Sequence, residues 1–150
     1  MSSINLSLPV AIAADHAGFA YKTELVNFLQ EKGLTLKDFG TSSASSVDYP
    51  DYAHPAAESV AKGECGFGIL LCGTANGVCM TANKHPEIRA ALCWENEVAS
   101  LVRKHNDANM IGIPARFVSL ELAKELVNTF ISTPFEGGRH ALRIQKMACT

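Results

Sequence analysis

Cys72 is the residue whose type and surroundings best suit chemistry. It ends an apolar segment, residues 69–72, and enters a turn bracketed by Gly73 and Gly77, with Thr74 placed to cap a helix that runs to about residue 83. Backbone N–H groups at such a turn form a ready anion site, and the helix dipole favours a thiolate there. Two interpretations remain open: a reactive thiol beside an anion site, or the last small hydrophobe of a buried strand.

Neither nucleotide binding nor a zinc site is predicted around this cysteine. The turn matches neither G-x-x-x-x-G-K-S/T nor G-x-G-x-x-G. Cys65, Cys72 and Cys79 follow one another at seven-residue steps, which is not the spacing of a structural zinc site, so no metal is expected. The chain has five cysteines, an odd number, so free thiols in a reducing, cytoplasmic setting are expected.

Asp15 and His16 follow directly on another apolar segment, residues 10–14. One interpretation makes Asp15 an N-cap and His16 a surface residue of the first helical turn. In the other, a carboxylate and an imidazole at the end of a strand bind hydroxyl or phosphate groups, and Gly18 lets a ligand approach the backbone. The position at a strand end favours the second interpretation.

His105 closes an amphipathic segment and shares one helical face with three apolar residues, Val98, Leu101 and Val102. A histidine on such a face is usually a buried core residue. Here Asn106 and Asp107 follow it, so a polar pocket is an equal alternative, and a helix C-terminus favours the protonated imidazole that an acid requires. His54 and His85 have no comparable partners and are expected at the surface.

Arg139 and Arg143 are four residues apart, so on a helix they point to the same side. Like charges at this spacing repel each other unless an anion lies between them, and a phosphate would accept several charge-assisted hydrogen bonds. The alternative is a pair of solvated arginines, with Glu136 as an ionic partner. Arg116, just after the last predicted strand, is a third candidate anion ligand.

The elements that must position these residues follow from the hydrophobic pattern. Short apolar segments alternate with longer amphipathic ones, which predicts an α/β fold with a parallel sheet covered by helices on both faces. Strands are expected at residues 10–14, 34–39, 67–72, 89–93 and 110–114. Helices are expected between them, and a last helix is expected near the end of the chain. In such sheets ligands bind at the carboxyl ends of the strands.

Length and composition fit one compact domain, residues 1–150, with 47% hydrophobic residues. Thirteen Lys and Arg residues oppose 15 Asp and Glu residues, so neither a nucleic acid nor an acidic membrane surface is predicted as a partner. No apolar run reaches the roughly 18 residues that a membrane-spanning helix needs. The expected partner is a small molecule or another protein.

Six motifs together resemble the type B ribose-5-phosphate isomerases in their order and spacing, over nearly the whole chain. They are Asp15-His-Ala-Gly18, Asp48-Tyr-Pro50, Cys72-Gly-Thr-Ala-Asn-Gly77, Ala82-Asn-Lys84, His105-Asn-Asp107 and Glu136-Gly-Gly-Arg-His140. The resemblance is to a family that also includes galactose-6-phosphate isomerase subunits. It implies a three-layer Rossmann-like fold with a five-stranded parallel sheet, no metal or other cofactor, and assembly into dimers or tetramers.

The same resemblance implies roles for the candidate residues. Cys72 matches the general base that moves a proton between C1 and C2 of the opened sugar through an enediolate, and His105, with Asp15, matches the acid that assists ring opening. Gly73, Thr74, Ala75, Asn76 and Gly77 match the family's anion hole, the set of N–H groups that stabilises the developing oxyanion. The other substrate-binding positions are Asp15, Tyr49, Asn106, which lines the sugar site, and the phosphate ligands His16, Arg116, Arg139 and Arg143.

Two positions depart from relatives of this type. Some relatives use a Glu just after the last loop glycine, but Val78 stands there, which leaves Cys72 as the only base in the loop. Ala75 replaces a glycine that is common in the loop, so the local backbone geometry is in question. The resemblance also implies that a neighbouring subunit contributes part of each site, with the last helix, about residues 137–147, at the interface.

The function expected from these residues is the interconversion of ribose 5-phosphate and ribulose 5-phosphate. That reaction needs a base, an acid, an oxyanion hole and phosphate ligands, and each has a candidate here. One alternative is an isomerase of a six-carbon sugar phosphate, such as allose or galactose 6-phosphate. Another is a sugar-phosphate-binding protein without catalysis, against which the presence of both Cys72 and His105 argues.

Overall fold

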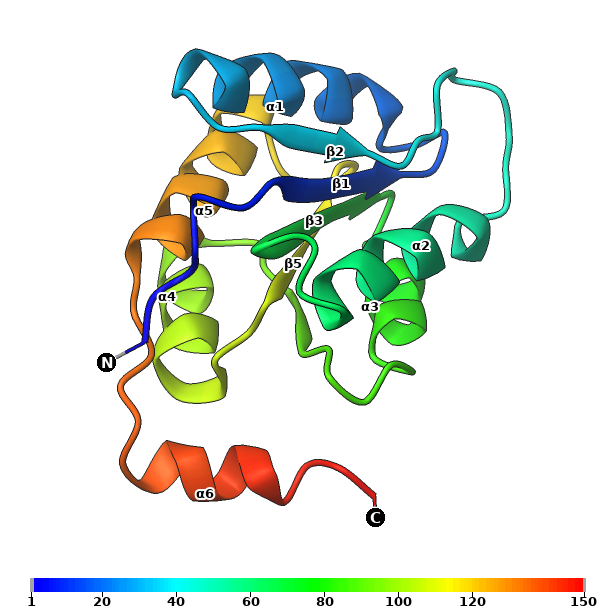
Figure 1. Ribbon diagram of the computed structural model, residues 1–150. Helices are drawn as coiled ribbons and strands as arrows, with labels where there is room; N and C mark the ends of the chain where they lie inside the picture. Colours follow the sequence, from blue (N-terminus) through cyan, green and yellow to red (C-terminus); the bar gives the residue numbers. More distant parts are fainter. Residues whose placement is uncertain (1, 150) are drawn as a thin grey trace.

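Five parallel strands form one sheet in the order β2-β1-β3-β5-β4 in this computed structural model, which describes residues 2–149 (Figure 1). The strands are β1 (Val10–Ala14), β2 (Leu36–Asp38), β3 (Phe67–Cys72), β4 (Ala90–Leu92) and β5 (Met110–Pro114). β1, β3 and β5 have the predicted boundaries. β2 and β4 are shorter than predicted because, at the edges of the sheet, each pairs with one neighbour only and its ladder ends sooner.

Helices cover both faces of the sheet, so the predicted three-layer α/β fold is confirmed (Figure 1). The helices are α1 (Phe19–Glu31), α2 (Pro50–Ala61), α3 (Asn76–Ala82), α4 (Asn96–Asn106), α5 (Leu120–Ser132) and α6 (Arg139–Gln145). α1, α4 and α5 pack on one face, α2 and α3 on the other, and α6 lies outside these layers against α4. None of the helices in residues 2–149 is long and apolar enough to cross a membrane.

Local sequence sets where the helices begin. Pro50 occupies the first turn of α2, where its missing N–H costs no hydrogen bond, and the Ser119 hydroxyl caps α5 by accepting a bond from the Leu122 N–H at 3.1 Å. At the start of α1, a Cβ on Gly18 would lie 2.6 Å from the Cβ of Leu71. Gly18 therefore lets α1 approach β3, where the sequence alone suggested room for a ligand.

The central strands are buried on both faces, and their side chains alternate between two apolar clusters. Ile12 and Ile69 belong to the cluster under α1, α4 and α5, whereas Leu70 and Cys72 belong to the cluster under α2 and α3. Because Cys72 belongs to the second cluster, its side chain points toward the face covered by α2 and α3.

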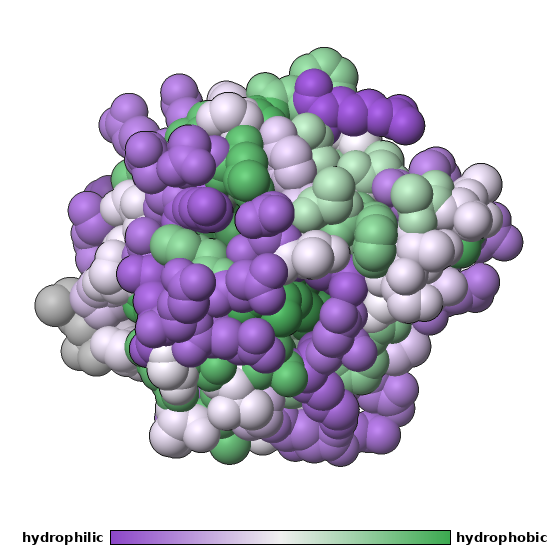
Figure 2. All heavy atoms as spheres, turned by 90° about the horizontal axis from the view of Figure 1, so that it is seen from above, coloured by the Kyte–Doolittle hydropathy of each residue, from purple (hydrophilic) through white to green (hydrophobic). Residues whose placement is uncertain are grey.

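On the outer side of α1 and β2, hydrophilic side chains are spread between smaller apolar areas (Figure 2).

Strand direction separates the candidate residues into two groups. Asp15, Cys72 and Arg116 follow or end β1, β3 and β5, so they lie at the carboxyl end of the sheet. α4 runs back across the sheet and ends at Asn106, just before β5 begins, so His105 lies at the amino end. Both groups are therefore present in one chain, but at opposite ends of its sheet.

A matched pair of leucine variants tests this assignment of the core. Leu29 in α1 is fully buried, whereas Leu101 in α4 is 37% exposed. Leu29→Ala is expected to lower the free energy of unfolding by about 2–5 kcal/mol, because it removes buried atoms and leaves a cavity. Leu101→Ala is expected to change it by less than about 1 kcal/mol. Urea denaturation measures both, and equal losses would contradict the assignment.

Candidate active site

The loop after β3 carries Cys72 into α3 through a residue with left-handed backbone. Cys72 is 8% exposed, and Ala75 has φ 61° and ψ 4°. Ala75 is the N-cap of α3, so the prediction that Thr74 caps this helix is wrong. The Thr74 hydroxyl instead accepts a hydrogen bond from the Asn76 N–H at 3.3 Å inside the turn. The chain reversal at Ala75, rather than a side-chain cap, sets where α3 starts.

Ala75 holds a conformation that glycine adopts more easily. A left-handed backbone costs an L-residue about 1–2 kcal/mol, because Cβ comes too close to the following carbonyl oxygen. The residue is fully buried in the cluster under α2 and α3, which helps to hold it in place. The loop thus keeps its reversal with alanine at this position, and stores strain there.

Two side chains from other loops lie against the glycines that bracket the turn. The ring of Tyr49, which precedes α2, is so close to Gly77 that a Cβ there would overlap it. Arg116 lies across Gly73. Its side-chain atoms are 3.1–3.3 Å from the position that a Cβ on Gly73 would take, and its backbone N–H donates to the Gly73 carbonyl at 3.2 Å. Tyr49 and Arg116, both predicted to bind substrate, therefore reach the Cys72 turn.

Asp15 is buried and caps the turn that precedes α1. Its Oδ1 accepts hydrogen bonds from the N–H groups of Ala17 at 2.9 Å and Gly18 at 3.2 Å. The adjacent His16 accepts a bond at Nδ1 from the Val47 N–H at 3.3 Å, which ties it to the loop before α2. The interpretation of Asp15 as an N-cap is therefore wrong, because Gly18 is the N-cap of α1 and no side chain caps this helix. Asp15 instead closes the turn before α1, at the same end of the sheet as Cys72.

A cavity of about 470 Å³ opens beside the turn at the carboxyl end of the sheet. Thr74 and Asn76 supply polar groups to it, and the rest of its lining is apolar: Leu92, Trp94, Pro114 and Phe117. Trp94 and Phe117 remain 52% and 73% exposed. The Cys72 turn thus borders both a space for a small ligand and an uncovered apolar surface.

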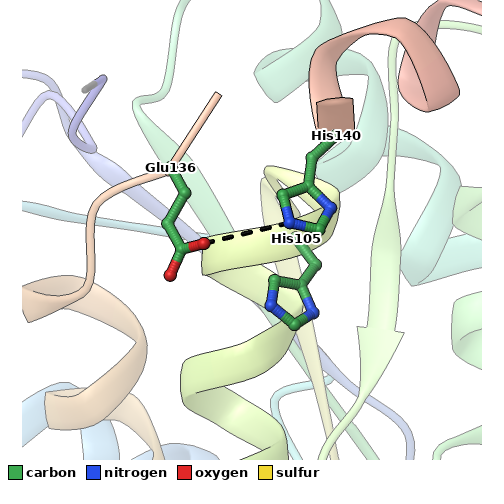
Figure 3. Close-up of side chains that lie close together, drawn as sticks. All are labelled: His105, Glu136 and His140. Carbon is green, nitrogen blue, oxygen red and sulfur yellow. Dashed lines mark ion pairs between the residues drawn. The ribbon is translucent and has the colours of Figure 1, made fainter. Parts of the chain in front are cut away.

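At the amino end of the sheet, His105 stacks on His140 of α6, with ring centroids 4.3 Å apart and planes 14° from parallel (Figure 3). His140 Nε2 lies 3.9 Å from the Glu136 carboxylate. Removal of the His140 ring from water, with the nearby positive charges of His105 and Arg139, lowers the pKa of His140 and favours its neutral form. Sequence reasoning missed His140, although it closes one of the six motifs.

Arg139 and Arg143 lie one helical turn apart on α6, as predicted. Both are exposed, and neither forms an ion pair with an acidic side chain within residues 2–149. Glu136 pairs with His140 instead, so the alternative in which it neutralises these arginines is wrong. The first turns of α6 therefore present two uncompensated positive charges, which suits an anion.

His105, Glu136 and His140 form the one group in the described chain whose ligand atoms lie close enough to hold a metal, all within 4.8 Å of one another. Two features oppose a cation there. The rings are nearly parallel, so their in-plane lone pairs do not converge on one point. The charges of Arg139 and Arg143, which also lower the pKa of His140, repel a positive ion.

The buried side of α4 agrees only in part with the predicted one. Val98 and Val102 pack partly buried against the core, as predicted, but Leu101 faces outward, and the fully buried residues are Ala99 and Arg103. The Arg103 guanidinium donates three hydrogen bonds, to Thr133 O at 3.1 Å, Asp107 Oδ1 at 2.8 Å and Ala108 O at 2.6 Å. Because these acceptors compensate a charge that is only 2% exposed, α4 can turn an arginine inward.

Cys72 and His105 do not meet within one chain. The register of β3 and β5 pairs Gly68 with Met110 at one end and Cys72 with Pro114 at the other. His105 precedes Met110, so it lies beyond the amino end of β5. Four residue steps along a strand span about 13 Å, which is too far for both side chains to contact the same sugar carbon.

His54 and His85 contact each other, contrary to the expectation that they lack partners. Their Nδ1 and Nε2 atoms lie 2.9 Å apart, and their rings meet edge to face. They come from α2 and from the segment after α3, which pack together on one face of the sheet. Neither joins the two groups of candidate site residues.

All five cysteines are free, and Cys149 is the exposed one. Burial raises the pKa of Cys79 and of Cys93 to about 12, with a smaller contribution in each case from a neighbouring cysteine. Both thiols therefore stay protonated near neutral pH and serve as core residues. Cys72, at the end of β3, is the cysteine that borders the turn.

A model of the Ribose/Galactose Isomerase family matches residues 10–147, a span that includes both groups of candidate residues. The chain is a member of this family. It is 45% identical over 136 residues to ribose-5-phosphate isomerase B from Escherichia coli, covering 91% of each chain. The family membership inferred from the six motifs is confirmed.

Solved structures of other ribose/galactose isomerases have the same fold. A ribose 5-phosphate isomerase from Thermotoga maritima is 50% identical, with a TM-score of 0.91 over 93% of this chain and 96% of that one. The ribose-5-phosphate isomerase B of Mycoplasma genitalium, solved with bound ribulose 5-phosphate, is 38% identical, with a TM-score of 0.91 over 95% of each chain.

The strain at Ala75 predicts an unusual response to glycine. Ala57 in α2 is also fully buried but helical, so Ala57→Gly is expected to cost about 1–2 kcal/mol of unfolding free energy through lost burial and helix propensity. Ala75→Gly loses the same methyl group but relieves the left-handed strain, so its cost is expected to be smaller by about 1 kcal/mol. Urea denaturation measures the free energy of unfolding of both variants. A larger loss in Ala75→Gly than in Ala57→Gly would contradict the presence of strain at Ala75.

Proposed function

We propose that this member of the Ribose/Galactose Isomerase family interconverts ribose 5-phosphate and ribulose 5-phosphate. The observation that carries the proposal is the Cys72 turn: a thiol at the carboxyl end of a parallel sheet, beside the N–H groups at the start of α3. The relative that is 45% identical is named for this reaction, and a relative of the same fold holds ribulose 5-phosphate.

In the proposed chemistry one proton moves between two carbons, and no outside electron donor or acceptor is needed. After ring opening, the Cys72 thiolate takes the proton from C2 of ribose 5-phosphate, and the C–H electron pair forms the C1=C2 bond of an enediolate with its negative charge on O1. The N–H groups of Gly73–Gly77 stabilise that charge. O1 gains a proton, O2 loses one, and Cys72 returns its proton to C1.

His105 and Asp15 act before this step. His105 gives a proton to the ring oxygen as the C1–O4 bond of the furanose breaks, and the O1 hydroxyl gives up its proton as the C1 aldehyde forms. Asp15 assists this step from beside the Cys72 turn. His16, Arg116, Arg139 and Arg143 bind the phosphate, and Tyr49 and Asn106 contact the sugar. The two exposed arginines of α6 favour this assignment, because they have no acidic partner in the described chain.

The site is completed by a second copy of the chain. The carboxyl end of one sheet supplies Cys72 and its turn, and the amino end of the other supplies His105 and α6. Apolar side chains next to both groups support this pairing: Trp94 and Phe117 near the turn, and Leu142 and Met147 near α6, are all more than half exposed. The assembly is a homodimer, or a tetramer built from such dimers, with free cysteines suited to the cytoplasm.

A six-carbon sugar phosphate is the second candidate substrate, because the matching family is described as acting on both ribose and galactose compounds. Values of kcat/KM for ribose, allose and galactose phosphates separate the two. A binding protein without catalysis would show tight binding of sugar phosphate and no turnover.

Removing the base tests the role of Cys72. Cys72→Ala is expected to lower kcat for ribose 5-phosphate by about 100- to 10,000-fold, the usual contribution of a general base. Cys149→Ala removes the exposed thiol and is expected to keep wild-type turnover. The rate of ribulose 5-phosphate formation gives the turnover of both variants, and near-full turnover in Cys72→Ala would contradict the proposed mechanism.

Hybrid dimers test whether two subunits share each site. Cys72→Ala and His105→Asn are each expected to be inactive alone. Refolded together in equal amounts, they form hybrids in which one site has both residues intact, so activity is expected to return to about a quarter of the wild-type value. If both residues acted within one chain, mixing would restore nothing.

A further inference from the structure

We propose that Arg103 is a positioning residue that holds the amino-end half of the active site, His105 and α6, in one fixed arrangement. The inference rests on the proposed function, because it assigns a role within that site. Arg103 itself is buried and contacts no substrate.

Three chain segments meet at the Arg103 side chain. It comes from the last turns of α4, where His105 also lies. Its Nε donates to Thr133 O, in the segment that leads from α5 to α6, and its Nη1 donates to Ala108 O, just before β5. A single guanidinium thus joins α4, the start of β5 and the segment that leads to α6. Arginine suits this position better than lysine, because its planar guanidinium holds several N–H donors in a fixed fork.

The surroundings of the guanidinium leave it little freedom. Arg103 is 2% exposed, it pairs with Asp107 at 2.8 Å, and its Cζ lies 5.6 Å from the centre of the Phe130 ring in α5. Asp107 in turn ends α4 with left-handed backbone, at φ 44° and ψ 45°, and its carbonyl accepts a bond from Arg89 at 2.9 Å. The end of α4 is therefore fixed by a network centred on one buried charge.

His105 depends on this network. It lies two residues after Arg103, and its ring stacks on His140 of α6. The Glu136 N–H donates to the Lys104 carbonyl at 3.1 Å, which is a second, weaker tie between α4 and the segment before α6. Without Arg103, α4 and α6 can shift relative to each other, and a misplacement of about 1 Å is enough to lower catalysis about 100-fold.

Lys22 provides a matched control for a purely structural role. It is also a buried cation, 3% exposed, and it pairs with Asp38 at 2.5 Å, which joins α1 to β2. It belongs to neither half of the proposed site. Arg103→Met is expected to lower thermal stability, because it leaves two buried main-chain carbonyls without their donor. Lys22→Met is expected to lower it less, because the side chain of its partner Asp38 is 43% exposed and stays in contact with water.

The first experiment compares kcat/KM for ribose 5-phosphate in Arg103→Met, Arg103→Lys and Lys22→Met, at a temperature where circular dichroism shows all three folded. Arg103→Met is expected to lose about 100-fold, and Arg103→Lys to recover part of that loss, because it keeps the charge but not the fork. Lys22→Met is expected to lose stability and keep near wild-type kcat/KM. Wild-type kcat/KM in both Arg103 variants, or an equal loss in Lys22→Met, overturns the proposal.

The second experiment places the defect in one half of the site. Arg103→Met refolded with Cys72→Ala is expected to regain activity, since the hybrid has one intact turn and one intact amino-end half. Arg103→Met refolded with His105→Asn is expected to regain none, because both changes affect the same half. Recovery with His105→Asn, or no recovery with Cys72→Ala, contradicts the proposal. A wild-type chain inactive toward ribose 5-phosphate rejects the proposed function instead, so the two failures are distinguishable.

Discussion

The direction of the strands is the constraint on which the rest of this structure depends. β1, β3 and β5 run the same way and are buried on both faces, so the loops that follow them gather at one end of the sheet. Each connecting helix must run back to start the next strand, so α4 delivers His105 to the opposite end. A parallel sheet therefore divides these residues between its ends, and pairing two copies of the chain is a simple way to unite them.

In the proposed site the two ends attract an anion by different physical means. At the carboxyl end, the left-handed residue Ala75 turns the chain into α3 and leaves N–H groups at the start of that helix free to donate. At the amino end, the exposed charges of Arg139 and Arg143 on α6 are the attraction, and the segment that leads to α6 is bonded at Thr133 by the buried cation Arg103. A developing oxyanion needs short-range donors, whereas a phosphate dianion is well served by exposed guanidinium groups.

Much of the fold could be predicted because it depends on patterns that are local in sequence. The central strands appear as continuous apolar segments, and six motifs in register identified the family. Arg103 could not be predicted in the same way, since two of its three acceptors are main-chain carbonyls, one of them 30 residues away, and an arginine on an amphipathic helix normally faces water. The left-handed Ala75 and the contact between His54 and His85 depend likewise on packing that no local pattern records.

A crystal structure with bound ribulose 5-phosphate is the measurement that tests the shared site most directly. C1 and C2 of the sugar are expected to lie within reach of the Cys72 Sγ of one subunit, while His105, Arg139 and Arg143 of a second subunit contact the same molecule. A sugar phosphate bound entirely by residues of one chain, with the His105 and α6 groups of both subunits turned to solvent, would contradict it.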